Sequence, residues 1–358
     1  MKSLLLYPLR KVKRWLLSDP VMTRVWAACV RWPWLADLYY CVSSQFRREH
    51  RAVLQGKLEH TRGRRTGAEG AEYTLRRNTH RLEKGLIMRP RRDVFATGYI
   101  DEAVDAYRAV CSSPAPDPTL VDWATDVLTE YFSVVGADET VDAARTRFEA
   151  VPRAHRPEDA RRLVPYRRDT DTLKADYDAM LQLAVRRRSV RWYLDKPVPR
   201  ELIDRAIDVA KLSPSACNRQ PFLFHIFDDP RNAARIGSIP MGTAGFSQNF
   251  PCLIVIVGDL SAYFSERDRH VIYVDGGLAA MALQFALEVQ GVSSCCINWP
   301  DIPQLERQMA EALDLPRHHR PIMCMSLGYA DPEGNVPFSQ KKSLNEIRRY
   351  RDPPQQTE

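Results

Sequence analysis

The sequence lacks the short motifs by which many nucleotide-binding and hydrolytic enzymes are identified. No G-x-G-x-x-G follows an apolar run, and no G-x-x-x-x-G-K-[S/T] is present, which excludes the common dinucleotide fingerprint and the P-loop. There is also no G-x-S-x-G serine elbow and no H-E-x-x-H zinc helix. A phosphorylated ligand would therefore have to be held by arginine, lysine and backbone amide groups.

Paired cysteines are absent as well. None of the eight cysteines forms a C-x-x-C pair, and most stand in apolar surroundings. We therefore expect reduced, buried thiols in a cytoplasmic protein. The neighbours Cys295 and Cys296 are a candidate redox pair, but adjacent cysteines form a strained bridge and their side chains alternate faces in a strand. A functional disulfide is not expected there.

The N-terminal part has few acidic residues and no uninterrupted apolar run. Basic residues break up positions 1–17, so a transmembrane helix is not expected there. Residues 1–65 hold 14 Lys and Arg against 4 Asp and Glu, which favours an anionic partner. The aromatic-rich stretch 25–42 is consistent with a peripheral helix on the inner face of a membrane, or with a helical layer packed on a catalytic domain. Nucleic acid is not expected, because no groove-binding motif accompanies the charges.

The chain does have the length and composition for two domains. It has 358 residues, of which 44% are hydrophobic and 27% charged. We divide it into a basic, all-helical N-terminal region at 1–170, a second domain at 171–350 and a disordered tail at 351–358. The spacing of His80 and Glu83 suits a metal, but without a second pair a salt bridge is favoured. Amphipathic patterns predict helices over 73–85, 99–110, 120–135 and 141–150, with a flexible linker over 56–70.

The second half alternates apolar runs with helical patterns, which predicts an α+β domain. The continuous apolar run at 253–257 predicts a strand buried on both faces. The segment 275–290 is apolar nearly all round and is therefore expected to be a buried helix. Further strands are expected at 222–227, 293–298 and 322–328, and further helices at 171–186, 202–210 and 303–313.

Four arginines lie within six residues at positions 186–191, and we call this segment the arginine knot. Their guanidinium groups repel one another unless an anion lies among them, and the planar fork of arginine suits phosphate oxygens. The other interpretation is a solvated helix end. A proline-containing turn, an amphipathic helix, the polar loop 213–221 and an apolar strand follow the knot, and a second basic pair stands at Lys341 and Lys342.

This order of elements, with the motifs R-R-S-V-R and P-S-x-x-N-x-Q-P, resembles the FMN-dependent nitroreductase family over roughly residues 181–350. The resemblance implies a nitroreductase-like α+β fold, with a central, mainly antiparallel sheet flanked by helices, and FMN bound at the interface of an intertwined homodimer. It also implies hydride transfer from NADH or NADPH, through flavin N5, to a small-molecule substrate. The long helical extension and the stretch 297–301 resemble a subgroup associated with bacterial surface-polysaccharide biosynthesis. The alternative is a non-catalytic, flavin-binding dimeric scaffold, docked to a membrane or a biosynthetic complex by its basic N-terminus.

The resemblance also assigns cofactor-binding residues, while the flavin itself carries the chemistry and neither a metal nor a protein nucleophile is required. Two positions depart from the family pattern, because Cys296 and Trp299 stand where many members have proline and glycine, which would narrow the pocket. The assigned residues are Arg187, Arg188 and Ser189 on the phosphate and ribityl chain, Arg191 beside the flavin, Pro214, Ser215, Asn218 and Gln220 in a loop that reaches the ring from the other subunit, Cys296, Ile297, Asn298 and Trp299 over the ring, and Lys341 and Lys342 on the phosphate.

Overall fold

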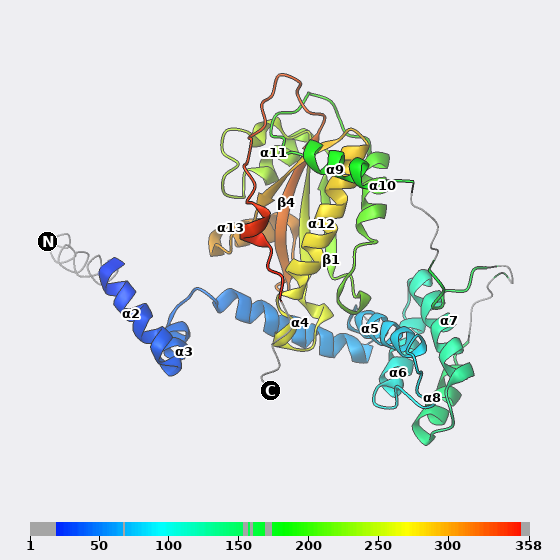
Figure 1. Ribbon diagram of the computed structural model, residues 1–358. Helices are drawn as coiled ribbons and strands as arrows, with labels where there is room; N and C mark the ends of the chain where they lie inside the picture. The colour runs from blue at the N-terminus through cyan, green and yellow to red at the C-terminus, as the bar shows by residue number, and fades with distance from the viewer. Residues whose placement is uncertain (1–18, 67–68, 153–156, 158–159, 169–173, 352–358) are drawn as a thin grey trace, which may run out of the picture.

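The computed structural model describes residues 19–66, 69–152, 157, 160–168 and 174–351 (Figure 1). Of the tail predicted at 351–358, residues 352–358 lie outside the described residues, as does the basic segment 1–17. Within them, a mixed half with one sheet follows an all-helical half, as predicted for an α+β chain with a helical N-terminal region. The predicted domain boundary near residue 170 remains a prediction.

The sheet has four antiparallel strands in the order β1-β2-β4-β3. Strand β2 lies between two neighbours and is buried over its whole length, which is why its sequence is apolar without alternation. The four predicted strands are confirmed, although β4 begins three residues earlier than expected. Their bounds are Phe222–Phe227 for β1, Cys252–Asp259 for β2, Ser293–Asn298 for β3 and His319–Gly328 for β4.

Helices cover both faces of this sheet. On one face, α10 (Arg200–Ala210) and α12 (Val271–Val289) pack Ile203 and Leu283 against Ile254. On the other face, α11 (Pro230–Gly237) and α13 (Pro303–Leu313) share a second core. Helix α9 (Tyr177–Arg186) precedes the arginine knot, and α14 (Leu344–Ile347) lies near the end of the described chain.

Helix α12 lies very close to the sheet, but it is not buried all round. A Cβ atom on Gly276 would lie 2.5 Å from Cδ1 of Ile322 on β4, so a larger residue there would require the Ile322 side chain to shift. The opposite face of α12 exposes Val274, Leu278 and Met281. The expectation of a fully buried helix is therefore wrong for that face. The segment Glu266–Val289 is also the one described helix long and apolar enough to cross a membrane, and half of it is buried inside the protein, as in an ordinary core helix.

The helical half has a hydrophobic core of its own. Buried side chains such as Leu75, Tyr107 and Leu128 pack together there. This core accounts for the amphipathic patterns seen in the sequence. The helices are α2 (Asp19–Arg31), α3 (Pro33–Val42), α4 (Arg47–Thr66), α5 (Glu69–Leu86), α6 (Ile100–Cys111), α7 (Pro118–Val134) and α8 (Glu139–Glu149), and the shared core is formed by α5 to α8.

The linker predicted over 56–70 is wrong, because α4 continues through this segment to Thr66. A Cβ atom on Gly56 would lie 2.6 Å from the carbonyl oxygen of Leu260, so this glycine allows α4 to lie directly against the sheet-containing half. Ala52 and Val53 of α4 share a buried cluster with Leu260. Helix α4 thus packs on the sheet-containing half, whereas the helical layer was predicted for residues 25–42, and α3 in that stretch has no buried residues. Helices α2 and α3 extend away from the sheet (Figure 1).

Candidate functional site

The arginine knot runs from the end of α9 along the edge strand β3. Ser189 forms a parallel bridge with Ser294, and the Val190 amide donates to the Ser294 carbonyl at 3.2 Å. Tyr193 fixes the segment from behind, because its hydroxyl donates to the Val190 carbonyl at 2.7 Å and lies 2.9 Å from the Ser326 hydroxyl. Backbone pairing and a buried tyrosine therefore set the direction of the knot.

The arginines of the knot have different surroundings. Arg186 forms an ion pair with Glu288 at 3.0 Å. Arg188 donates to the carbonyls of Pro337 and Phe338. Arg187 has a buried Nε without a hydrogen-bond partner, and Arg191 donates to the Ser189 carbonyl at 3.3 Å. Among the described residues, no carboxylate pairs with the last three of these arginines, so their positive charge is available to an anion.

A cavity of about 430 Å³ adjoins the knot, and we call it the knot cavity. Its lining includes Val185 and Arg188 from the knot side and Phe338, Ser339 and Lys341 from the C-terminal segment. The structure thus brings the two predicted basic groups together, although about 150 residues separate them in the sequence. Lys342 is exposed and does not line the cavity.

The segment predicted to cover a flavin ring is the end of β3 and the one residue after it, Trp299. Ile297 points into the core, whereas Cys296 and Asn298 are exposed, as strand alternation requires. The indole Nε1 of Trp299 donates to Glu306 Oε1 at 2.8 Å, so this ring is held by α13.

The arginines of the knot also act on the pKa of Cys295 in β3. Burial raises the pKa of the Cys295 thiol, although Arg191, the Ser189 hydroxyl and Arg187 act in the opposite direction. The thiol therefore stays protonated at neutral pH. All eight cysteines are free, as expected, but the prediction that most are buried is wrong, because only Cys252, Cys295 and Cys324 are buried.

The predicted loop between α10 and β1 has an unusual backbone conformation that its own hydrogen bonds fix. The Gln220 amide donates to Ser215 Oγ at 3.0 Å, and Gln220 Nε2 donates to Asn218 Oδ1 at 3.0 Å. Asn218, Gln220 and Cys217 all have φ near +52°. Three non-glycine residues in the left-handed region within four positions are unusual, and such geometry concentrates at binding sites. Pro214, the remaining predicted residue of this loop, is exposed.

This loop does not meet the arginine knot within one chain. The loop leads into Phe222 of β1, which pairs through Gly258 of β2 with the level of Arg320, at the start of β4. The knot pairs with Ser294 of β3, which lies opposite Leu327, near the end of β4. Seven residues of β4 separate these levels, roughly 20 Å at the rise of a strand. The loop and the knot also lie at opposite edges of the sheet.

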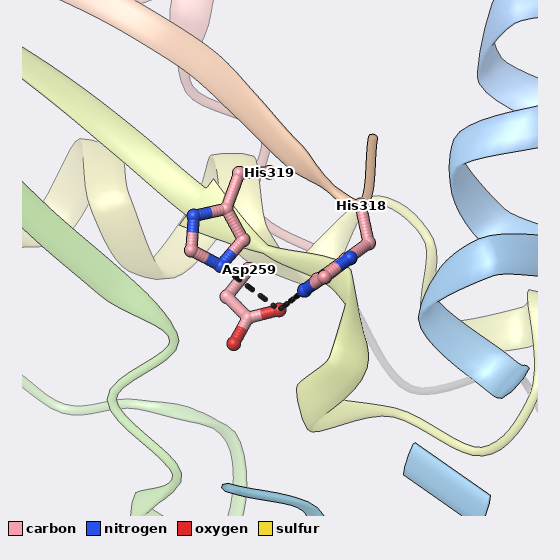
Figure 2. A group of neighbouring side chains, drawn as sticks. All are labelled: Asp259, His318 and His319. Carbon is pink, nitrogen blue, oxygen red and sulfur yellow. Dashed lines mark ion pairs between the residues drawn. The ribbon is translucent and has the colours of Figure 1, made fainter. Parts of the chain in front are cut away.

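A buried polar cluster that the sequence did not reveal joins the two halves of the chain. His318 and His319 lie 3.9 and 3.7 Å from Oδ1 of Asp259 (Figure 2). The other oxygen, Oδ2, accepts a hydrogen bond from the Tyr73 hydroxyl of α5 at 2.9 Å, and the Ser261 amide donates to Oδ1 at 2.7 Å. Adjacent histidines before a strand were the available signal, but Asp259 and Tyr73 are far away in the sequence.

The same cluster has metal-binding residue types, and its candidate ligand atoms lie within 4.8 Å of one another. Tetrahedral zinc would bring such atoms to about 3.3 Å apart, given metal–ligand bonds of about 2.0–2.1 Å. The oxygens of Asp259 already accept three hydrogen bonds from Tyr73 and Ser261. The cluster therefore serves here as a hydrogen-bonded anchor between the halves, and we call it the Asp259 anchor.

The other predicted metal candidate is a salt bridge, as the sequence favoured. His80 lies 3.4 Å from Glu83 on the same helix. Glu83 also accepts a hydrogen bond from the Trp123 indole at 3.0 Å. This carboxylate is thus already engaged by its neighbours.

Comparison with known proteins finds similarity over the sheet-containing half. Residues 184–244 and 240–329 match the family model "Nitroreductase family". A 4-nitrobenzoate reductase from Pseudomonas putida is 34% identical over 98 residues, which cover 27% of this chain and 40% of that protein. An FMN reductase [NAD(P)H] from Bacillus subtilis is 24% identical over 179 residues, covering 46% of this chain and 71% of that protein.

Two solved structures also resemble part of the chain. An FMN-dependent nitroreductase from Clostridium difficile has 23% sequence identity and a TM-score of 0.42, and the match covers 48% of this chain and 100% of that one. A nitroreductase family protein from Streptococcus pneumoniae has the same identity, TM-score and coverage.

Proposed function

We propose that this chain, which carries a nitroreductase-family domain in its C-terminal half at residues 184–329, is an FMN-dependent oxidoreductase that uses NADH or NADPH. The observation that carries the proposal is the knot cavity, which is lined by both Arg188 and Lys341. The buried and unpartnered Nε of Arg187 is close by in the sequence. Several cations without carboxylate partners suit a phosphate dianion.

The residues present fit the phosphate end of FMN. Arg187, Arg188 and Ser189 would hold the phosphate together with Lys341 and Lys342. Bound FMN would supply hydride transfer, taking a hydride from NAD(P)H and passing it to a small-molecule acceptor. Within the protein, Arg191 would place a positive charge beside the ring.

The end of β3 and the residue after it would lie over the same ring, with Cys296, Ile297, Asn298 and Trp299 as its residues. Because α13 holds the Trp299 indole through Glu306, this side chain would narrow the space above the ring. We propose that the acceptor is a dedicated biosynthetic small molecule, and that surface-polysaccharide biosynthesis is its setting.

A homodimer would complete the site. Ser215, Asn218 and Gln220 lie roughly 20 Å from the knot in their own chain, by the strand rise of β4. The loop of a second subunit would reach the flavin instead. The apolar face of α12 gives this dimer a surface, because its exposed side chains follow helical spacing at Val274, Leu278, Met281 and Val289.

The test is flavin retention. We expect the double variant Arg187→Ala/Arg188→Ala to lose bound FMN on purification while keeping its circular dichroism spectrum, because the phosphate would lose two charge-assisted partners. Arg205→Ala is the matched control, since this arginine is exposed on α10 and has no ion pair among the described residues. Equal flavin content in both variants would contradict the proposal.

A second candidate function is a non-catalytic, flavin-binding scaffold that docks on a membrane. The observation in its favour is the exposure of Trp26, Trp32, Trp34 and Tyr40 on α2 and α3, which extend away from the sheet (Figure 1). Such aromatic side chains suit the headgroup region. We propose a cytoplasmic protein in peripheral contact with the membrane in either case. Steady-state NAD(P)H oxidation separates the candidates, because a scaffold would show no turnover.

A further inference from the structure

A second cationic cavity lies between the two halves of the chain. It is enclosed by the first turns of α4, by α13 and by the start of β4, and its volume is about 630 Å³. We call it the α4–α13 cleft. None of the residues assigned above to FMN lines it. Six arginines do, namely Arg47, Arg48, Arg51, Arg307, Arg317 and Arg320.

The acidic side chains nearby neutralise only part of this charge. Glu306 lines the cleft and pairs with both Arg48 and Arg320, and Asp301 lies 3.6 and 3.2 Å from the same two arginines. The other four arginines have no carboxylate partner among the described residues. Six guanidinium groups thus face two carboxylates, and one of these, Glu306, also accepts a hydrogen bond from the Trp299 indole. Such an excess repels itself unless an anion is bound.

Arg320 is the buried arginine in the wall of this cleft. Its side chain is only 4% exposed, and its Nε and Nη1 have no hydrogen-bond partner. A buried guanidinium with unsatisfied donors is costly, and an anion bound in the cleft would offset part of its uncompensated positive charge. The exposed Arg47, Arg51, Arg307 and Arg317 surround the opening with further planar donors.

We infer that the α4–α13 cleft binds a small ligand that carries a diphosphate group, such as a nucleoside diphosphate. A single phosphate would leave most of the arginines unpartnered, whereas two linked phosphates present enough oxygens for several guanidinium forks. The volume lies in the range of small-molecule sites. Because α4 forms one wall, this site depends on the helical extension, which gives that extension a role in ligand recognition.

Titration calorimetry on the full chain tests the inference, with excess FMN present so that the knot cavity is occupied. The probes are ADP and pyrophosphate, with inorganic phosphate for comparison. The test variant is Arg51→Gln/Arg317→Gln, since both side chains are exposed and their loss leaves the buried pairs of Glu306 intact. Arg108→Gln, an exposed arginine on α6, is the control.

We expect one site per chain for ADP and for pyrophosphate, weaker binding of phosphate, and a dissociation constant raised about tenfold or more in the double variant. The control variant should bind as the unmodified chain does, and FMN content should be equal in all three. Absence of diphosphate binding, or an equal loss in the control, would overturn the inference. Binding to anionic phospholipid vesicles that is lost in the double variant, without binding of ADP, would also overturn it in favour of a membrane surface.

Discussion

Removing the Asp259 carboxylate should loosen the attachment of the helical half more than any other single truncation in the anchor. The residue is 3% exposed, and its oxygens accept hydrogen bonds from Tyr73 and Ser261. Asp259→Ala would remove the carboxylate that accepts hydrogen bonds from the Tyr73 hydroxyl and from the amide and hydroxyl of Ser261. A hydrogen bond to a charged group contributes about 1.5–3 kcal/mol, and such losses are not fully additive, so we expect a loss of roughly 3–5 kcal/mol of unfolding free energy.

Urea unfolding followed by circular dichroism measures this loss. Tyr73→Phe removes one of the three donors and should cost about 1–2 kcal/mol. Asp208→Ala is the control, because that carboxylate is 65% exposed and pairs only with Lys211 one turn away, so its change should stay within about 0.5 kcal/mol. An Asp259→Ala variant as stable as the control would refute the reasoning.

The same anchor predicts a dependence on pH. Burial acts to raise the pKa of Asp259, but the nearby His319 imidazole and the hydrogen bonds from Ser261 outweigh it and hold this pKa below its usual range. The charged carboxylate therefore stabilises the folded chain above the unfolded pKa of about 3.9, and this contribution is lost as the pH falls through the folded pKa. The stability difference between the unmodified chain and Asp259→Ala should shrink in that acidic window. If the stability difference between the two proteins stayed the same at pH values below this window, the Asp259 carboxylate would not be the group responsible.

Three further predictions concern the contacts between elements. Gly56→Val should cost about 1–3 kcal/mol in urea unfolding, because its Cβ would meet the backbone of Leu260 at 2.6 Å, whereas Gly98→Val, with open space around it, should cost less. Met281→Glu should shift the proposed homodimer to monomer in sedimentation, since a charge would enter the apolar face of α12, and an unchanged dimer would remove that face from the interface. Trp299→Gly should lower KM for bulky acceptors in steady-state assays, and an unchanged KM would mean that the indole does not narrow the pocket.

The strands could be predicted because their signals are local. The apolar run of β2 marks a strand buried on both faces, and four arginines in six residues predict an anion site at the knot. Lys341 lines the knot cavity with Arg188 while Lys342 does not, and the predicted contact of this basic pair with a phosphate stays a prediction.

The misses come from contacts between distant segments. Gly56 suggested a flexible linker, but the glycine serves close packing of α4 on Leu260, which no local pattern reveals. The α4–α13 cleft likewise gathers arginines from three elements whose individual charges look like ordinary solvated faces. The exposed face of α12 was missed because an apolar surface that would pair with a second subunit has the same composition as a core.

The most direct test of the central claim is the absorption spectrum of the purified chain before and after anaerobic addition of NADPH or NADH. The account predicts flavin bands that bleach on addition, in the unmodified chain but not in Arg187→Ala/Arg188→Ala, which should be colourless. A colourless unmodified chain that also fails to bind added FMN would contradict the assignment and leave the knot cavity as a site for a different anion.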